Sequence, residues 1–402
     1  RRDGLACVRT PAGVVSAEFA DGTAIVGIGQ TEYSKAAGRS ETQLACESIT
    51  SALADCGLLP GDVDGLVSYT VDPVEETELA RAIGFREIKW SSRVPYGGGG
   101  SQGVVQHAAA AVASGAADVV VAYRAIKARS GGRFGRADAR PQAGFNHAGT
   151  TAAQWCMPYG IFTPASWMAL NVTRYMHDSG ATSKDFGRAV VQFRDYAAAN
   201  PNSHFYGRPI TLEDHQASRW VAEPGIRLFD CCQETDGSAA LVITHADRAA
   251  DTLAPVRIAA VASAGLFEEE IATDHYTPNL AIMDSSVAVA RSLFGGSGVT
   301  RDDIDVALIY DAFSPMLLMQ LEGLGFCGFG EAKDFVADGQ LGPDGQLPCN
   351  TNGGLIGEGY IHGLNLTLEA VRQLRGTAIN QIAGARTALV SASRTATILQ
   401  VD

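Results

Sequence analysis

Residues 62–72 read DVDGLVSYTVD, and residues 303–313 read DIDVALIYDAF. The two stretches pair at one constant offset, which sets Asp64 against Asp305 and Tyr69 against Tyr310. Each is a short apolar run opened by acidic turn residues, a pattern typical of a buried β-strand. The constant offset indicates that the chain contains a duplicated unit.

The sequence around these two strands repeats as well. A helix-like stretch and a turn precede each one, SALADCGLLPG at residues 51–61 and ARSLFGGSGVT at residues 290–300. Because strands that alternate with helices form βαβ units, the pattern predicts a largely parallel sheet in each half. We expect further strands at residues 24–29, 117–123, 255–263 and 387–393, and Gly-rich turns leading into helices at residues 97–114 and 353–374.

The duplication is interrupted by a segment that lacks the pattern. Residues 124–223 are rich in Gly, Arg, Pro and aromatic residues, and we expect an inserted loop domain with its own helices, for example at residues 167–178. Residues 236–243 (DGSAALVI) then return to the sheet. The sequence therefore predicts an N-terminal half at residues 1–250, interrupted at about 124–223 by the loop domain, and a C-terminal half at residues 251–402. Together they would form a five-layered α/β/α/β/α sandwich.

The composition limits the possible partners. Of the 402 residues, 46% are hydrophobic and 19% are charged, which supports a large core and argues against disorder. A formal net charge of −13 argues against nucleic acid as a partner, because phosphate neutralisation requires a basic face. No apolar run reaches the roughly 18 residues of a membrane helix. The N-terminus has no charged-then-apolar signal pattern, so we expect a cytoplasmic location and no membrane.

Four motifs resemble those of the thiolase superfamily. Residues 310–313 (YDAF) resemble the Asn-Glu-Ala-Phe motif of thiolases, and more closely the His-Asp-Cys-Phe motif of sterol-carrier-protein-x thiolases. Residues 352–354 (NGG) and 359–363 (GYIHG) resemble the Gly-Gly and Gly-His-Pro-x-Gly segments. Residues 236–240 (DGSAA) resemble the Asp-Gly-Ala-Ala strand. The resemblance covers nearly the whole chain and implies a duplicated thiolase fold.

The departures from the thiolase pattern bear on function. Gly97 stands where thiolases carry the nucleophilic Cys, and residues 391–394 (SASR) replace the second catalytic Cys. Without a thiolate no acyl-enzyme can form. Tyr310 and Tyr360 replace two catalytic polar residues, which resembles the lipid-transfer-protein-like steroid side-chain aldolases of bacterial sterol catabolism. That resemblance implies retro-aldol cleavage of a 17-hydroxy steroid acyl-CoA to a 17-keto steroid and propionyl-CoA.

Retro-aldol cleavage of a β-hydroxyacyl thioester needs a base, an acid and fixed donors for the thioester oxygen. We predict Tyr310 and Tyr360 as the catalytic acid and base, with their individual roles left open. We expect His362 to be a donor beside Tyr360. The substrate-binding set is completed by the Gly-rich turns, whose backbone N–H groups can hold the thioester oxygen: Gly97, Gly98, Asn352, Gly353 and Gly354.

The sequence predicts no cofactor and no metal, because coenzyme A is part of the substrate and the product. A Schiff-base route needs a desolvated Lys, and the five lysines lie outside the motifs. A metal route needs a His and carboxylate cluster, whereas the eight histidines are scattered. None of the eight cysteines forms a C-x-x-C pair.

A basic run in the inserted segment has two readings. It is either a solvated loop or a patch for the phosphates of coenzyme A, which thiolases bind through their insertion, and Arg suits phosphate because its fork binds bidentately. The run holds six basic residues and one acidic residue, Asp138: Arg124, Lys127, Arg129, Arg133, Arg136 and Arg140.

The resemblance also implies partners. We expect a homodimer formed through a first-half strand at roughly residues 91–96, and a complex with an OB-fold, zinc-ribbon subunit of the accompanying enoyl-CoA hydratase. Three alternatives to the aldolase remain open. They are a non-catalytic acyl-CoA or lipid-binding protein, a thiolase-type acyltransferase, and a nucleotide-dependent oxidoreductase, although residues 353–359 (GGLIGEG) lack the context of a dinucleotide fingerprint.

Overall fold

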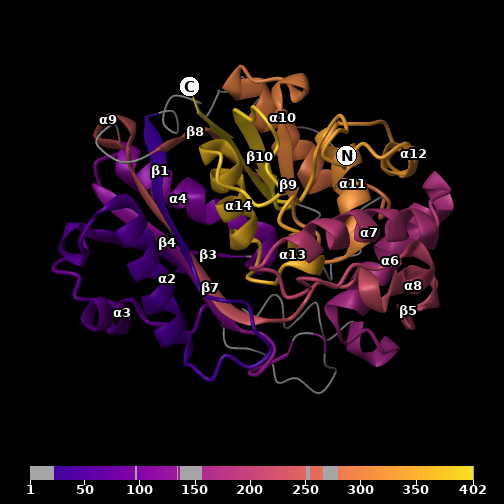
Figure 1. The fold of residues 1–402 in the computed structure, drawn as a ribbon, viewed down its shortest axis with the longest axis horizontal. Helices are drawn as coiled ribbons and strands as arrows, with labels where there is room; N and C mark the ends of the chain where they lie inside the picture. Colours follow the sequence, from indigo (N-terminus) through magenta and orange to yellow (C-terminus); the bar gives the residue numbers. More distant parts are fainter. Residues whose placement is uncertain are drawn as a thin grey trace, which may run out of the picture.

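The computed structural model describes residues 22–95, 97–133, 135, 156–249, 254–265 and 279–401. Nine of its strands form one sheet in the order β3-β2-β4-β7-β1-β8-β11-β10-β9 (Figure 1). The first half contributes β1 (Thr23–Gln30), β2 (Gly65–Tyr69), β3 (Trp90–Val94), β4 (Val119–Lys127) and β7 (Asp236–His245). The second half contributes β8 (Val256–Ser263), β9 (Val306–Ile309), β10 (Thr387–Ser391) and β11 (Thr395–Gln400).

The two halves of this sheet have the same strand order and directions. Outward from the centre the first half runs β1-β7-β4-β2 and the second runs β8-β11-β10-β9. In each half the second strand is antiparallel to both of its neighbours, and the third and fourth strands are parallel. The halves meet where β1 pairs with β8, over only two positions. The duplication predicted from the sequence is confirmed, and the predicted boundary at residue 250 lies outside the described residues.

The prediction of a largely parallel sheet is wrong. Among the strands that the structure describes, only β3–β2, β2–β4 and β9–β10 are parallel pairs, because β7 and β11 run against their neighbours. Three residues join β10 to β11, and so short a connection can form only a hairpin, since a parallel crossover needs a dozen residues or more. Strand β7 forms a long antiparallel ladder with β4 across the whole of β4.

The two repeated aspartates make equivalent hydrogen bonds in the two halves. Oδ1 of Asp64 accepts hydrogen bonds of 2.9 Å from the backbone N–H groups of residues 118 and 119, where β4 begins. Oδ2 of Asp305 accepts bonds of 2.8 and 2.9 Å from residues 386 and 387, where β10 begins. Each aspartate thus fixes the start of the strand that pairs with its own.

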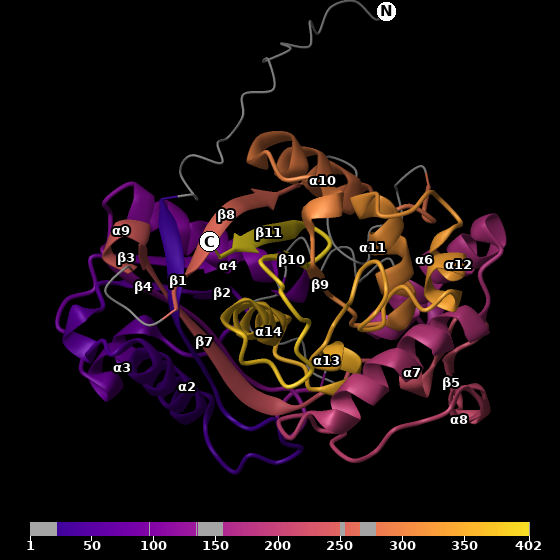
Figure 2. The same ribbon diagram turned by 45° about the horizontal axis from the view of Figure 1, so that its top comes forward.

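The two halves of the sheet form two layers with helices between them, and further helices cover their outer faces, which makes five layers (Figures 1 and 2). Helix α2 (Glu41–Cys56) covers the outer face of the first half, with α3 (Glu76–Ile83) beside it, and α10 (Asp284–Ser297) covers the second half. Helices α4 (Ser101–Ala113) and α14 (Leu364–Arg375) each pack against strands of both halves, so they form the central layer. The predicted α/β/α/β/α sandwich is confirmed by this arrangement.

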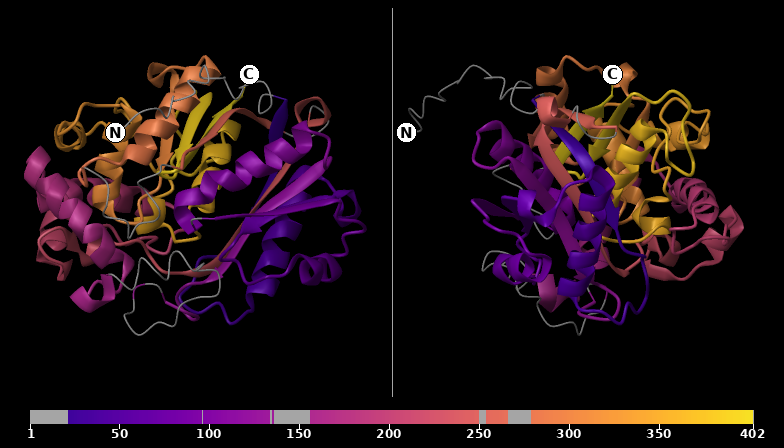
Figure 3. Two further views of the ribbon diagram at one scale, coloured as in Figure 1. Left: turned by 180° about the vertical axis from the view of Figure 1, so that it is seen from behind. Right: turned by 60° about the vertical axis from the view of Figure 1, so that its left-hand side comes forward.

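The inserted segment lies against the second half of the molecule (Figure 3). Its described elements include α6 (Pro164–Ser179), α7 (Ser183–Ala199), α8 (Leu212–Ala217) and β5 (Trp220–Ala222), which pairs with β6 (Ile226–Arg227) just beyond it. Helix α7 packs on α11 (Ser314–Leu324), α12 (Ala332–Ala337) and α13 (Gly354–Gly357). The helix expected at residues 167–178 is confirmed as α6, whereas β4 continues to Lys127, past the expected start of the insertion. Across the described ranges, no helix is both long and apolar enough to span a membrane.

Candidate active site

Two tyrosines from separate segments meet in the second half. Tyr310 directly follows β9, and Tyr360 lies in residues 358–363, which separate α13 from α14. Their hydroxyl oxygens are 2.9 Å apart, so one can donate a hydrogen bond to the other. Tyr310 is buried and Tyr360 is half-buried. The expectation that these hydroxyls converge is confirmed, and their catalytic role stays a prediction.

Residues 358–363 are not helical, which corrects the single helix expected at residues 353–374. His362 and Gly363 have φ angles of +49° and +83°, in the left-handed region that interrupts a right-handed helix. A Cβ on Gly363 would lie 2.9 Å from Cδ2 of Tyr310, so a glycine is needed where this segment crosses the tyrosine ring. Because the helix is broken here, the rings of Tyr360 and His362 lie with centroids 5.1 Å apart, although residues two apart on a helix do not face each other.

The glycine turn of the first half lies directly against this pair. A Cβ on Gly98 would lie 1.9 Å from Oη of Tyr310, so only a bare backbone fits there. A Cβ on Gly97 would have His362 as its nearest neighbour, at 3.8 Å from Cε1 and 4.0 Å from Nε2. A Cβ on Gly99 would lie 3.4 Å from Oγ of Ser393. Ser393 belongs to the segment that stands in place of the second catalytic cysteine of thiolases. The positions of both lost cysteines therefore lie at the glycine turn that contacts Tyr310 and His362.

Arg124 belongs to this site and not to a phosphate patch, which corrects one of the two readings of the basic run. Its side chain is 1% exposed, and Nη1 donates to Oδ2 of Asp72 at 2.8 Å. Its Nε donates to Nδ1 of His362 at 3.0 Å. Farther along the run, Arg133 pairs with Glu234 at 2.7 Å, and Arg136 and Arg140 lie outside the described residues.

Burial sets the protonation of the three site groups. Desolvation raises the pKa of Tyr310 well above its ordinary value, and the neighbouring Tyr360 raises it further. Desolvation likewise raises the pKa of Tyr360. Desolvation, then the adjacent Arg124 charge, lowers the pKa of His362 well below its usual range. At neutral pH the site therefore presents two neutral hydroxyls and a neutral imidazole.

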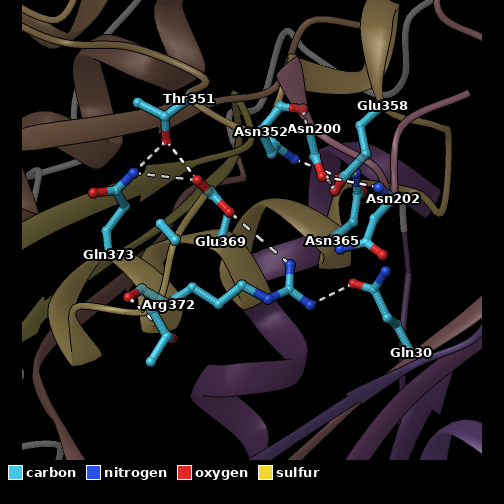
Figure 4. Close-up of polar contacts among 12 residues, drawn as sticks. Gln30, Asn200, Asn202, Thr351, Asn352, Glu358, Asn365, Glu369, Arg372 and Gln373 are labelled. Carbon is cyan, nitrogen blue, oxygen red and sulfur yellow. Dashed lines mark hydrogen bonds and ion pairs between the residues drawn. The ribbon is translucent and has the colours of Figure 1, made fainter. Parts of the chain in front are cut away.

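Asn352, another of the predicted binding residues, lies in a separate buried network (Figure 4). Asn352 donates to Oε2 of Glu358 at 2.6 Å and accepts from the backbone N–H of Gly354 at 3.0 Å. A Cβ on Gly353 would lie 2.6 Å from Cβ of Ala197 on α7. The structure thus brings Gly97, Gly98 and His362 to the tyrosines. It places Asn352, Gly353 and Gly354 at the base of the segment that carries Tyr360. Their contact with substrate stays a prediction.

Glu358 anchors the segment of residues 358–363, and the pKa of its carboxyl is raised. Asn352 and Asn365 both donate to its Oε2, at 2.6 and 2.7 Å, and it is fully buried. Desolvation is the main reason that its pKa is raised to about 7, while Arg372 and the two amides act in the opposite direction.

We expect replacement of Glu358 by Gln to flatten the pH dependence of stability. A carboxyl whose pKa is higher in the folded state stabilises the protein at low pH, and this contribution is lost as pH rises through about 7. The parent should therefore lose roughly 1–3 kcal/mol more than Glu358→Gln between pH 5 and 8. Urea unfolding across this range measures the difference, with the exposed Glu87→Gln as control. Parallel curves for parent and Glu358→Gln would show that Glu358 is not the titrating group.

Comparison with known proteins identifies the family. A family model described as thiolase C-terminal domain-like matches residues 268–399. A steroid side-chain-cleaving aldolase of Thermomonospora curvata is 50% identical over 370 residues, which cover 92% of this chain and 94% of that protein. The chain belongs to the steroid side-chain-cleaving aldolases. The resemblance stated from the motifs is thereby confirmed.

Two further relatives of this aldolase agree. The 17-hydroxy-3-oxo-4-pregnene-20-carboxyl-CoA lyase of Mycobacterium tuberculosis is 51% identical over 92% of this chain and 95% of its own length. A solved Ltp2–ChsH2(DUF35) aldolase has a TM-score of 0.90 at 48% identity, covering 96% of this chain and 99% of that one.

Sequence reasoning missed the roles of Asp72, Arg124 and Glu358. Arg124 carried a signal, since it falls within the apolar run VVVAYRAI of residues 119–126, where an unpaired charge would be costly. Asp72 is the last residue of the repeated stretch with which the duplication was found. Among the residues that the structure describes, no group of three His, Cys, Asp or Glu side chains is placed to hold a metal ion. The described cysteines that form no disulfide include Cys46, Cys56, Cys231, Cys232, Cys327 and Cys349.

Proposed function

We propose that this aldolase cleaves a 17-hydroxy steroid side-chain acyl-CoA to a 17-keto steroid and propionyl-CoA, with Tyr310 and Tyr360 as its proton-transfer groups. The main support for this proposal is the pair of tyrosine hydroxyls, whose oxygens lie 2.9 Å apart, at a site where Gly97 replaces the thiolase nucleophile. The substrate class is supported by the name of the Mycobacterium tuberculosis relative, a 17-hydroxy-3-oxo-4-pregnene-20-carboxyl-CoA lyase.

The pair suits a reaction that moves one proton within the substrate. As the hydroxyl proton leaves, its electron pair forms the ketone, the carbon–carbon bond breaks, and that bond's electrons pass into the thioester as an enolate. One tyrosine accepts the substrate proton while its own proton passes to the second tyrosine, which protonates the enolate carbon. Both tyrosines end protonated, so their raised pKa values do not oppose the reaction. Which tyrosine faces the substrate hydroxyl stays open.

The enolate oxygen needs fixed donors. The Gly97–Gly100 turn leads directly into α4, so the positive end of that helix dipole lies beside the tyrosines. We assign the backbone N–H groups of this turn to the thioester oxygen, since bare glycines allow close approach.

The test is turnover in heavy water. Incubation with the 17-hydroxy steroid acyl-CoA should yield the 17-ketone and propionyl-CoA with one deuterium at its α carbon, because tyrosine protons exchange with solvent. Binding without turnover would instead support a non-catalytic acyl-CoA-binding protein. Acyl transfer without a ketone would support a thiolase-type acyltransferase.

We expect neither tyrosine nor His362 to contribute a pH dependence to kcat/KM between pH 6 and 9, a range in which the buried carboxyls of Glu358 and Asp311, with pKa values raised to about 7, are the site groups that titrate. The pKa values of both tyrosines are raised from about 10, so deprotonation of either falls above this range, and the lowered pKa of His362 falls below it. Initial rates measured at each pH, with circular dichroism to confirm folding, give the profile. A rate that rises with a midpoint between pH 8 and 9, above the range in which these carboxyls titrate, would indicate a standing tyrosinate base and contradict the neutral pair.

The proposed assembly rests on two observations. Strand β3 is the terminal strand of the described sheet on the first-half side, which leaves its outer edge for a second copy of the chain, and we propose a homodimer there. A monomer in sedimentation at micromolar concentration would contradict it.

The Ltp2 relative is solved with ChsH2(DUF35), and we propose a comparable OB-fold, zinc-ribbon partner here. Cytoplasmic location and activity without a cofactor are part of the same proposal.

A further inference from the structure

Arg124 joins three parts of the chain within the core. It lies on β4, its carboxylate partner Asp72 lies in the turn after β2, and His362 lies between α13 and α14. Oδ2 of Asp72 also accepts from the backbone N–H of Ala125 at 3.1 Å, which fixes the carboxylate. The side chains of Asp72 and Arg124 are 0% and 1% exposed. Because a buried charge is costly unless paired, this ion pair forms a rigid base for His362.

The arrangement dictates the tautomer of His362. A guanidinium N–H can only donate, so Nδ1 of His362, at 3.0 Å from Nε of Arg124, must be the accepting, unprotonated nitrogen. The ring is kept neutral by burial and by the Arg124 charge, which lower its pKa. The single ring proton of a neutral imidazole must then be on Nε2.

The Cε1–Nε2 edge of the ring faces the position of the missing Gly97 side chain. A Cβ on Gly97 would lie 4.0 Å from Nε2 and 3.8 Å from Cε1, and the Tyr360 ring is 5.1 Å away between centroids. Because Gly97 has no side chain, the space beside its Cα is bordered by His362, and the next residue, Gly98, contacts Tyr310.

We propose that His362 donates its Nε2–H to the thioester oxygen of the substrate, and that Arg124, held by Asp72, is the positioning residue that keeps the proton on Nε2. This inference rests on the proposed retro-aldol function and adds a side-chain donor to the backbone N–H groups. As the carbon–carbon bond breaks, the thioester oxygen gains charge, so the hydrogen bond strengthens in the transition state. His362 transfers no proton in this scheme.

His362→Asn tests the donor with little other change. The Asn Oδ1 replaces Nδ1 as acceptor for Arg124, and Asn tolerates the positive φ at this position, but nothing replaces the Nε2–H. We expect kcat to fall about 10²–10³-fold, as for loss of an oxyanion-hole donor, with KM and the unfolding temperature nearly unchanged. The exposed His177→Asn is the control and should match the parent. If His362→Asn keeps kcat within about threefold, the ring only fills space beside Arg124 and the proposal is wrong.

The tautomer can be read without substrate. In protein labelled with ¹⁵N-histidine, the His362 signals are those that disappear in His362→Asn. We expect an unprotonated Nδ1 and a protonated Nε2 in the parent. The paired variant Arg124→Met/Asp72→Asn leaves no lone buried charge and should shift the proton toward Nδ1. A parent His362 protonated at Nδ1, or at both nitrogens, would overturn the proposal. Absence of turnover in the parent would instead refute the proposed function and leave the tautomer result standing.

Discussion

Replacing Tyr310 or Tyr360 by Phe is expected to lower kcat by about 10²–10⁴-fold, the usual cost of losing a positioned proton-transfer group. Each change keeps the ring and its packing. It leaves the partner hydroxyl without its 2.9 Å contact, which costs about 1 kcal/mol of stability. Steady-state cleavage rates and thermal unfolding of both variants measure the two effects separately.

Tyr33→Phe is the matched control. This tyrosine is also buried, and its ring packs against Gly359 in the segment that carries Tyr360. Its hydroxyl has no hydrogen-bond partner among the described residues, so its removal should leave the rate unchanged. If either site variant folds normally and keeps a near-parent rate, that tyrosine is neither the acid nor the base. An equal loss in Tyr33→Phe would trace the effect to packing.

Gly98→Ala is expected to lower both activity and stability. The added Cβ would lie 1.9 Å from Oη and 2.3 Å from Cζ of Tyr310, so the turn or the tyrosine must move. A shift of about 1 Å at a reacting group costs about 10²-fold in rate. The forced repacking costs about 1–3 kcal/mol. Kinetics and urea unfolding of the purified variant measure both.

Gly295→Ala is the matching control for this substitution. Gly295 lies in α10, and no described atom comes within 4 Å of an added Cβ. Because Ala is favoured over Gly inside a helix, this variant should be as stable as the parent or slightly more stable, with an unchanged rate. A Gly98→Ala variant that behaves like Gly295→Ala would show that Gly98 does not constrain Tyr310.

Much of the fold could be predicted because the chain repeats itself. Asp64 and Asp305 occupy equivalent positions, and their side chains make the same contacts at the starts of β4 and β10. Strand direction could not be predicted in the same way. A short apolar run such as residues 236–243 has the same pattern in a parallel or an antiparallel pair, and only the ladder with β4 decides between them.

The parts of the candidate site that lie in recognisable motifs could be predicted from the sequence. The parts that depend on a break in the backbone helix or on a buried ion pair could not. Tyr310 and Tyr360 were found from their motifs, and the structure brings their hydroxyls together. The break before α14 depends on Gly363 crossing the Tyr310 ring, a contact that no local pattern encodes. Arg124 was grouped with an exposed basic run because its partner Asp72 is distant in sequence. Asn352 had the pattern of a binding turn, but its amide is bonded to Glu358.

The double variant Tyr310→Phe/Tyr360→Phe tests most directly whether the two hydroxyls act as one proton-transfer chain. If each depends on the other, removal of either breaks the chain, and removal of both costs little more than removal of one. We predict that kcat of the double variant lies within about threefold of the slower single variant. Losses that multiply, so that the double variant is slower by the product of the two single effects, would contradict a shared chain and assign the tyrosines independent roles.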